Sequence, residues 1–315
     1  MSRPRNQAPL RVGTRSSLLA RIQSQLVADA LRASLSREVV LVEVTTDGDI
    51  STAPLASMGG VGVFVNALRE ALLRGEVDVA VHSLKDIPTY PQDGVTLAAV
   101  PTREDPRDAL VARDGLTLGE LPAGASVGTG SPRRAAQLAA LGLGLRIVDI
   151  RGNVDTRLRK VTEGQVDAVL LARAGLARIG RLDAITEALD PLQMLPAPGQ
   201  GALAVECRSD DTFLVDRVRE AVDHAPTRMT VTVERTVLGA LEAGCSAPVG
   251  ALAEIAQGDD GDELWVRAVA LSYDGAVAVR RSATGTPDDA VGLGQRLAAE
   301  MIEDGAGTLV GERAS

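Results

Sequence analysis

Aromatic side chains are almost absent from this chain of 315 residues, which has two phenylalanines, two tyrosines and one tryptophan. Its hydrophobic cores must therefore be aliphatic, built from Val, Leu, Ile and Ala. The apolar fraction of 45% and the charged fraction of 24% are ordinary for a soluble globular protein. A chain of this length exceeds one ordinary hydrophobic core, so two or three domains are expected.

Lysine and cysteine are also scarce. The only lysines are Lys85 and Lys160, so arginine carries nearly all of the positive charge of the 33 basic residues. The two cysteines, Cys207 and Cys245, provide no disulfide framework. Reduced thiols in a cytoplasmic protein are the expectation.

The chain has no apolar run of the roughly 18–20 residues that a membrane span needs. Its N-terminal stretch, Met1–Leu10, lacks the apolar core of a secretory signal. The net charge of −9 and the pI of about 4.9 argue against a general nucleic-acid binder. We therefore expect a cytoplasmic protein that binds neither membranes nor nucleic acid.

Two pairs of motifs recur in the same order along the chain. The first pair is RVGTRSS and SVGTGSP, and each member indicates a short strand, then V-G-T-x-S, then a helix. The second pair is GEVDVAVHS and GQVDAVLLA, and each member indicates a glycine that ends a helix, then V-D and a buried strand. Before the second motif, the first copy has an expected strand over 39–46 and an expected helix over 64–74. The second copy has an expected strand over 145–152 and an expected helix over 153–163. This pattern predicts two α/β units with parallel sheets covered on both faces.

Two segments rich in proline separate these units. Val100–Ala109 is densely charged and indicates a hinge, and Leu195–Cys207 ends in an apolar strand that we expect to return to the first lobe. Two connections between two lobes predict a clamshell with a cleft.

The C-terminal part has a different pattern. A helix is expected over Thr230–Gly244, then alternating strands over 249–256, 263–271 and 276–284, and a last helix from Thr286-Pro287 to near Gly305. We expect a small α+β domain with a three-stranded antiparallel sheet. The predicted domain boundaries are 1–101 with 198–222, then 102–197, then 223–315.

Candidate anion sites stand at the strand-to-helix turns. Helix N-termini favour anions, and arginine recognises carboxylates or phosphates bidentately. The turns carry Arg15 and Ser17, then Ser131, Arg133 and Arg134, then Arg151 and Arg157. Each arginine alone could equally be a surface charge, but their gathering at equivalent turns indicates a polyanionic small molecule as ligand.

Lys85 and Asp86 follow a buried strand, at the edge where open sheets bind ligands. Asp86 could stabilise a developing cation or shuttle a proton, or it could be a surface partner of Lys85. We interpret His82 as a structural hydrogen-bonding residue. Cys245, on a glycine turn, could be a nucleophile, although most such thiols are simply buried, as we expect of Cys207.

The glycine-rich segment around Gly60 and Gly62 lacks the Lys-Ser/Thr pair of a phosphate loop. A flexible lid before the helix that begins near Phe64 is the better interpretation.

Taken together, the motifs VHSLKDIP (Val81–Pro88), GTGSPRR (Gly128–Arg134), RGNVDTR (Arg151–Arg157) and EAGCSAPVG (Glu242–Gly250) resemble those of porphobilinogen deaminases. The resemblance implies two lobes similar to type II periplasmic binding proteins and a third domain with the cysteine. The sequence departs from the family pattern at Val61, where a lysine is common, and at Pro132, which suits a first helical position.

The resemblance also implies residue roles. Cys245 would carry a dipyrromethane cofactor through a thioether, and Asp86 would be the catalytic carboxylate. Residues implied in holding the cofactor are Ser83, Lys85, Asp86, Thr129, Ser131, Arg133 and Arg134. Residues implied in binding substrate are Arg15, Ser17, Arg151, Arg157, Arg178 and Gln200.

The implied activity is a transferase reaction of tetrapyrrole (haem) biosynthesis. Porphobilinogen molecules lose ammonia and condense head to tail on the dipyrromethane, and water then releases hydroxymethylbilane. The resemblance implies a monomer without a metal. The alternatives are a non-catalytic anion-binding clamshell, a ligand-sensing regulator and an inactive family member. A solute-binding clamshell is expected to carry a signal peptide and a regulator a basic recognition helix, and the sequence indicates neither.

Overall fold

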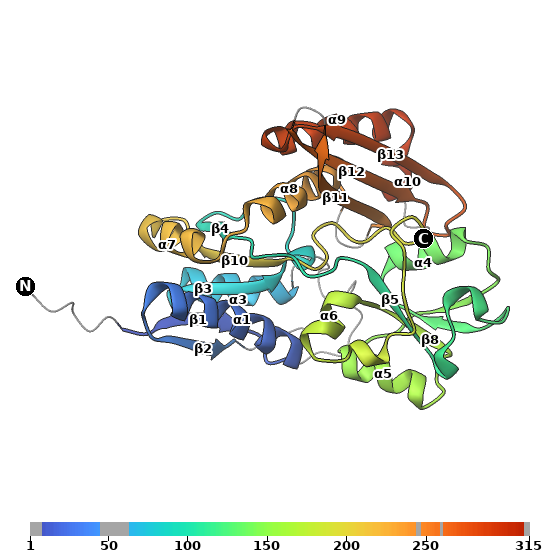
Figure 1. Ribbon diagram of the computed structural model, residues 1–315, viewed down its shortest axis with the longest axis horizontal. Helices are drawn as coiled ribbons and strands as arrows, with labels where there is room; N and C mark the ends of the chain where they lie inside the picture. The colour runs from blue at the N-terminus through green and yellow to red at the C-terminus, as the bar shows by residue number, and fades with distance from the viewer. Residues whose placement is uncertain (1–7, 45–62, 244–246, 259–260, 312–315) are drawn as a thin grey trace, which may run out of the picture. The chain divides into compact units, whose positions relative to one another are not determined.

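The computed structural model describes residues 8–44, 63–243, 247–258 and 261–311. The chain divides into two compact units, the first made of Met1–Arg103 with Ala202–Arg228 and the second of Glu104–Gly201 with Met229–Ser315. Figure 1 traces the elements of both units by residue number. The division into three domains at the predicted boundaries stays a prediction.

The first unit contains a five-stranded sheet of order β2-β1-β3-β10-β4. Helices cover both of its faces, α1 and α7 on one and α3 on the other, as the two separate clusters of buried side chains indicate. The elements are β1 (Leu10–Thr14), α1 (Leu18–Leu35), β2 (Val39–Glu43), α3 (Val63–Leu73), β3 (Val79–Ser83), β4 (Val95–Ala99), β10 (Leu203–Arg208) and α7 (Thr212–Val222).

The second unit contains a sheet of the same plan, with the order β7-β6-β8-β5-β9. Side chains of α4 pack on one face and those of α5 and α6 on the other. The elements are β5 (Asp108–Ala112), β6 (Ser126–Gly128), α4 (Pro132–Ala140), β7 (Arg146–Val148), α5 (Val154–Thr162), β8 (Ala168–Ala172), α6 (Arg173–Arg178) and β9 (Glu187–Ala188).

The internal repeat predicted from the motifs is confirmed in atomic detail. The carboxylate of Asp78 accepts a hydrogen bond of 2.9 Å from the backbone N–H of Arg11, and that of Asp167 accepts one of 2.7 Å from the N–H of Ser126. Asp78 directly precedes β3 and its partner Arg11 lies on β1, whereas Asp167 directly precedes β8 and its partner Ser126 lies on β6. The V-D of both motifs therefore ties the same two strands together.

The prediction of purely parallel sheets is wrong. The strand β10 runs antiparallel to β3 and β4, and β5 runs antiparallel to β8. Both strands follow a connection between the units, and each begins at the edge where its antiparallel neighbour, β3 or β8, ends, since Leu203 pairs with Ser83 and Asp108 with Ala172. A strand that enters a sheet at that edge must run in the opposite direction.

The return of the chain to the first sheet is confirmed by the pairing of β10 with β3. The predicted hinge ends earlier than expected, because its last two residues, Asp108 and Ala109, already belong to β5. The elements β4, β5, α6, β9, α7 and α10 were not anticipated from the sequence.

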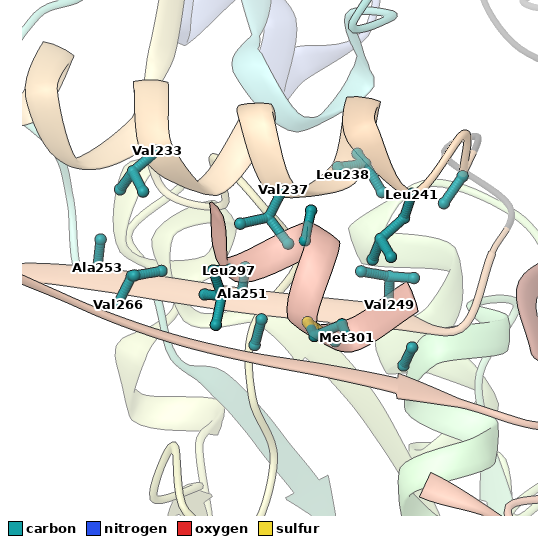
Figure 2. Close-up of a cluster of buried hydrophobic side chains, with 14 of the residues drawn as sticks. Val233, Val237, Leu238, Leu241, Val249, Ala251, Ala253, Val266, Leu297 and Met301 are labelled. Atoms are coloured by element: carbon teal, nitrogen blue, oxygen red, sulfur yellow. The ribbon is translucent and has the colours of Figure 1, made fainter. Parts of the chain in front are cut away.

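The C-terminal part of the second unit is an antiparallel sheet of three strands, β11 (Val249–Gly258), β12 (Gly261–Leu271) and β13 (Ala278–Gly285). It packs with α8 (Ala225–Ala240), α9 (Ala290–Glu303) and α10 (Ala306–Gly311). Figure 2 shows Val233 and Val237 of α8 facing Ala253 and Val266 across an aliphatic core. The α8 helix begins five residues before the predicted Thr230, at Ala225. The predicted fold class, two α/β lobes and a small α+β domain, is confirmed.

Candidate functional site

The residues predicted to be functional in the first unit follow the carboxyl ends of two neighbouring strands. Arg15 and Ser17 come directly after β1, Ser83 ends β3, and Lys85 and Asp86 lie in the single 3-10 turn η2 (Leu84–Asp86). Because β1 and β3 are paired in parallel, both groups stand at one edge of the sheet. The structure thus brings these predicted residues of the first unit together.

The turn that carries Asp86 is firmly anchored. Leu84 and Ile87 are buried on either side of Lys85 and Asp86, and the N–H of Leu84 donates a 3.0 Å hydrogen bond to the carbonyl of Ala202. The side chain of Asp86 itself is exposed. A fixed backbone with an exposed carboxylate suits a group that must meet a developing positive charge.

The two serines at this edge also have local partners. The hydroxyl of Ser17 caps α1, accepting a hydrogen bond from the N–H of Ala20 at 3.4 Å. Ser83 exchanges hydrogen bonds with the amide of Gln23 at 3.1 and 3.3 Å. Ser17 thereby closes the first turn of the helix whose N-terminus lies beside Arg15.

A buried ionic cluster lies behind the Asp86 turn. Glu206 of β10 accepts two hydrogen bonds from Arg69, and its Oε2 lies 3.4 Å from Nε2 of His82. Burial alone would raise the pKa of Glu206, but its partners lower that pKa to about 2. His82 is buried beside Glu206, but its Nε2 makes no hydrogen bond among the described residues, so the structural hydrogen bond expected of His82 stays a prediction.

In the second unit, the turn between β6 and α4 repeats this arrangement. Ser131 caps α4 by accepting from the N–H of Arg134 at 3.5 Å, and Thr129 accepts from the N–H of Ser131 at 3.2 Å. Pro132 is the first helical residue, as predicted. A side chain at Gly130 would place its Cβ 2.8 Å from the carbonyl oxygen of Ile150, so the turn has no room for one.

Arg133 and Arg134 are buried together on a single carboxylate, that of Asp108. Nη1 of Arg133 lies 2.7 Å from Oδ2, and Nη2 of Arg134 lies 2.7 Å from Oδ1. Their remaining contacts are with backbone carbonyls, from Arg133 to Leu195 at 2.6 Å and from Arg134 to Leu170 at 3.0 Å. Two guanidinium groups thus share one negative charge.

Arg151 and Arg157 add positive charge beside this cluster. Burial, and then the neighbouring charges of Arg134 and Arg151, lower the pKa of Arg157. Its Nε donates a 2.8 Å hydrogen bond to the carbonyl of Gly152, and Arg151 lies 3.8 Å from Asp149. Like charges gathered at the carboxyl edge of β6 and β8 favour a bound anion, which would relieve their repulsion.

The side chains of Arg178 and Gln200 make hydrogen bonds to other residues of the second unit. Arg178 donates a 2.6 Å hydrogen bond to the carbonyl of Gly201. Gln200 is fully buried and donates to the carbonyl of Pro106 at 2.7 Å and to Oδ1 of Asp108 at 2.9 Å. Arg178 thus contacts the backbone of Gly201, and Gln200 contacts Pro106 and Asp108. The binding of substrate by these two residues stays a prediction.

Some predicted residues lie outside the described part of the chain, namely Cys245, Gly60, Gly62 and Val61, together with the side chain of Phe64. Cys207 is described, and its predicted place in the core is confirmed. It is fully buried in the aliphatic cluster under α1, and burial raises the pKa of its thiol to about 12.

Sequence reasoning missed Asp108. Asp108 was assigned to the hinge Val100–Ala109, and no strand was predicted there. Only an antiparallel strand places its first residue at the carboxyl edge of the sheet. The signal available was an aspartate near the end of the hinge, directly before the apolar run ALVA. Glu234 of α8 was also missed; it is fully buried and accepts hydrogen bonds from the N–H groups of Gly199 and Ala253.

The fold and the site define a mixed α/β protein with arginines near the carboxyl edge of each of its two five-stranded sheets. Two family models match the chain, the porphobilinogen deaminase, dipyromethane cofactor binding domain over residues 10–216 and the porphobilinogen deaminase, C-terminal domain over residues 228–303. The chain belongs to the porphobilinogen deaminase family.

Curated relatives are similar over almost the whole chain. It is 57% identical to the porphobilinogen deaminase of Nocardia farcinica, with 98% of this chain and 89% of the relative covered. It is 58% identical to that of Mycobacteroides abscessus, with 96% and 99% covered, and 57% identical to that of Mycobacterium tuberculosis, with 96% and 98% covered.

Solved structures with a similar chain trace include periplasmic binding proteins. An ABC transporter periplasmic substrate-binding protein from Coxiella burnetii has a TM-score of 0.43 and 14% identity, covering 67% of this chain and 92% of its own. The methionine-binding protein MetQ has a TM-score of 0.42 and 15% identity, covering 67% and 89%.

The residues present fit the cofactor named by the family model. Each pyrrole unit carries an acetate and a propionate, so a dipyrromethane is a polyanion, and Arg133 and Arg134 exceed their carboxylate partner by one positive charge. In addition, Nε of Arg133 is buried without a hydrogen-bond partner among the described residues. The same part of the chain contains no group of three or more His, Cys, Asp or Glu that could hold a metal, and no helix long and apolar enough to cross a membrane.

Proposed function

We propose that this protein is a working porphobilinogen deaminase, which condenses four porphobilinogen molecules on a dipyrromethane carried by Cys245 and releases hydroxymethylbilane. The observation that supports this most strongly is the buried pair Arg133–Arg134 on the single carboxylate of Asp108, at the edge of a sheet and beside a helix N-terminus. A charge surplus in a buried place is costly unless a ligand balances it.

The proposed roles divide between the two units. Thr129, Ser131, Arg133 and Arg134 would hold the cofactor carboxylates, with Ser83 and Lys85 as further contacts from the first unit. Substrate carboxylates would be met by Arg15, Ser17, Arg151, Arg157, Arg178 and Gln200. Gly60, Gly62 and Phe64 would form a lid.

Asp86 would carry the chemistry that needs a fixed charge. Loss of ammonia from porphobilinogen leaves a cation on the substrate, and the exposed carboxylate of Asp86 would stabilise it through the pyrrole N–H. The bound dipyrromethane supplies a carbon nucleophile to which the first substrate unit is joined. The anchored turn keeps Asp86 in place, so little reorganisation is needed when positive charge develops.

Placement in the cell and assembly state complete the proposal. We propose a cytoplasmic monomer that binds neither nucleic acid nor membranes. The acidic balance of −9 and the lack of a long apolar run support this. Sedimentation of the purified protein at a mass near 32.7 kDa would support the monomer, and twice that mass would refute it.

Incubation with porphobilinogen tests the activity. The purified protein should consume porphobilinogen and release one ammonia for each molecule consumed. A non-catalytic anion-binding protein on the same fold would bind porphobilinogen, which calorimetry would detect, but release no ammonia. Binding without ammonia release would therefore reject the proposed activity in favour of that alternative.

A further inference from the structure

Asp108 is the carboxylate shared by the two buried arginines of the β6–α4 turn. It is fully buried, and four contacts converge on its two oxygens: Nη1 of Arg133 at 2.7 Å, Nη2 and Nε of Arg134 at 2.7 and 3.0 Å, and Nε2 of Gln200 at 2.9 Å. Burial alone would raise the pKa of Asp108, but the charges of Arg133 and Arg134 hold that pKa well below its usual range. Asp108 therefore stays ionised.

The topology puts this charge directly behind the candidate site. Asp108 is the first residue of β5 and pairs with Ala172, the last residue of β8. Because β5 runs against its neighbour, Asp108 stands at the same edge as the β6–α4 turn with Thr129 and Ser131. A carboxylate at the other end of the strand could not reach the two arginines.

The arginine pair needs such a partner. Two buried guanidinium groups repel each other, and each would adopt another rotamer or draw in water if nothing held it. In the described part of the chain no other carboxylate lies within ion-pair distance of Arg133 or Arg134. One shared carboxylate fixes both side chains and still leaves one positive charge uncompensated. A second carboxylate would have neutralised the pair.

We propose that Asp108 is the positioning residue of the cofactor site: it fixes the guanidinium groups of Arg133 and Arg134 and leaves one positive charge for a carboxylate of the dipyrromethane. The proposal rests on the proposed function. Asp108 would act through the arginines: its Oδ1 accepts hydrogen bonds from Arg134 and Gln200, and its Oδ2 lies 2.7 Å from Nη1 of Arg133 without a hydrogen bond among the described residues. Its effect is to keep the donors in the orientation that the cofactor needs.

The test compares cofactor loading per folded molecule. Asp108→Asn keeps the shape of the side chain but removes its charge, and Asp114→Asn, at an exposed position of the same unit, is the matched control. Each variant is purified by size exclusion, incubated with porphobilinogen and weighed intact under denaturing conditions. In metal sites, removal of a residue that orients a ligand typically costs about 10- to 100-fold in affinity. By the same reasoning, cofactor loading of folded Asp108→Asn should fall at least about tenfold. The control should load like the wild type.

A merely structural role would give a different result. It would reduce the yield or melting temperature of Asp108→Asn, while the molecules that fold would load normally, and that outcome overturns the proposal. If Asp108→Asn does not fold, Asp108→Glu decides, because it keeps the charge but displaces it by one methylene. Folded Asp108→Glu should load several-fold less than wild type, and wild-type loading would overturn the proposal.

A further variant separates this inference from the proposed function. Arg134→Met removes one of the donors itself. Loading that is lost in Arg134→Met but complete in Asp108→Asn would refute the positioning role and leave the cofactor site intact. A wild-type protein that gains no mass from porphobilinogen would refute both the proposed function and the inference that rests on it.

Discussion

Arg69 and Glu206, 137 positions apart in the chain, meet in the interior of the first unit, where Nε and Nη2 of Arg69 lie 2.9 and 2.7 Å from the two oxygens of Glu206. The pair joins α3 to β10. Since β10 also pairs with β3, which leads into the Asp86 turn, the pair links three elements of the first unit.

Glu206→Gln tests this pair through its pH dependence. The pKa of Glu206 is about 2 in the folded protein against 4.5 ordinarily, so the ionised group stabilises the fold above about pH 4.5 and loses this effect as the pH falls towards 2. The shift corresponds to about 3 kcal/mol. Urea unfolding should show a deficit of that size for the variant at pH 7, shrinking below pH 4.5.

The control for this prediction is Glu254→Gln, which breaks an exposed ion pair with Arg267. Exposed pairs contribute between about 0 and 1 kcal/mol, so its deficit should be small. A deficit of Glu206→Gln that stays constant from pH 7 to 3 would contradict the assignment of the low pKa to Glu206.

Gly201→Ala should be among the most damaging substitutions of a small residue. Gly201 has a φ of +90°, and a Cβ there would lie 2.3 Å from the carbonyl oxygen of Glu104. Gly142→Ala is the matched control, because its φ is +65° but no atom lies within 4 Å of the added Cβ.

The control should cost about 1–2 kcal/mol for the left-handed backbone alone. Gly201→Ala should cost about 1–3 kcal/mol more because of the clash. Thermal melting of both variants measures the difference. Equal melting temperatures would mean that the backbone at Glu104 and Gly201 can separate easily.

The internal repeat predicts equal penalties at equivalent positions. Asp78→Ala and Asp167→Ala each remove the acceptor of a backbone N–H at the start of a central strand, on Arg11 and Ser126 respectively. Each should cost about 1–3 kcal/mol. Exposed Asp93→Ala should change the unfolding free energy by less than about 0.5 kcal/mol. A large loss for only one of the two aspartates would contradict their equivalence.

The features that could be predicted from the sequence are those set by local chemistry. The V-G-T-x-S turns lead into helix caps, at Ser17 one residue after the first motif and at Ser131 within the second. These caps and the glycines at 75 and 164, with φ of +69° each, depend only on nearby residues. They gave the repeat and most of the site. The strand directions could not be predicted in this way, because the antiparallel entry of β5 and β10 depends on where the chain crosses between units.

Asp108 shows the consequence of this limit. Its role depends on a pairing with Ala172, 64 positions away by register, and on arginines from a third segment. Residue type and spacing alone make it one of two aspartates in a charged hinge. The arginines were identified as anion ligands, whereas the carboxylate that orients them requires the fold.

Asp86→Asn tests the proposed catalytic role. The substitution removes the charge but keeps the size of an exposed side chain, so the melting temperature should be unchanged. Loss of a preorganised stabilising group should lower the rate of ammonia release by about 100-fold or more. Asp93→Asn, also exposed in the first unit, should retain the full rate. An Asp86→Asn enzyme with the wild-type rate would remove Asp86 from the mechanism.

The central claim is that this chain carries its own cofactor on Cys245, and intact mass under denaturing conditions tests it most directly. The wild type, incubated with porphobilinogen, should exceed the polypeptide mass by two linked pyrrole units. Cys207→Ala should retain this excess, because Cys207 is buried in the aliphatic core, and Cys245→Ser should lack it. A bare mass in the wild type, or an excess that survives in Cys245→Ser, would contradict the account.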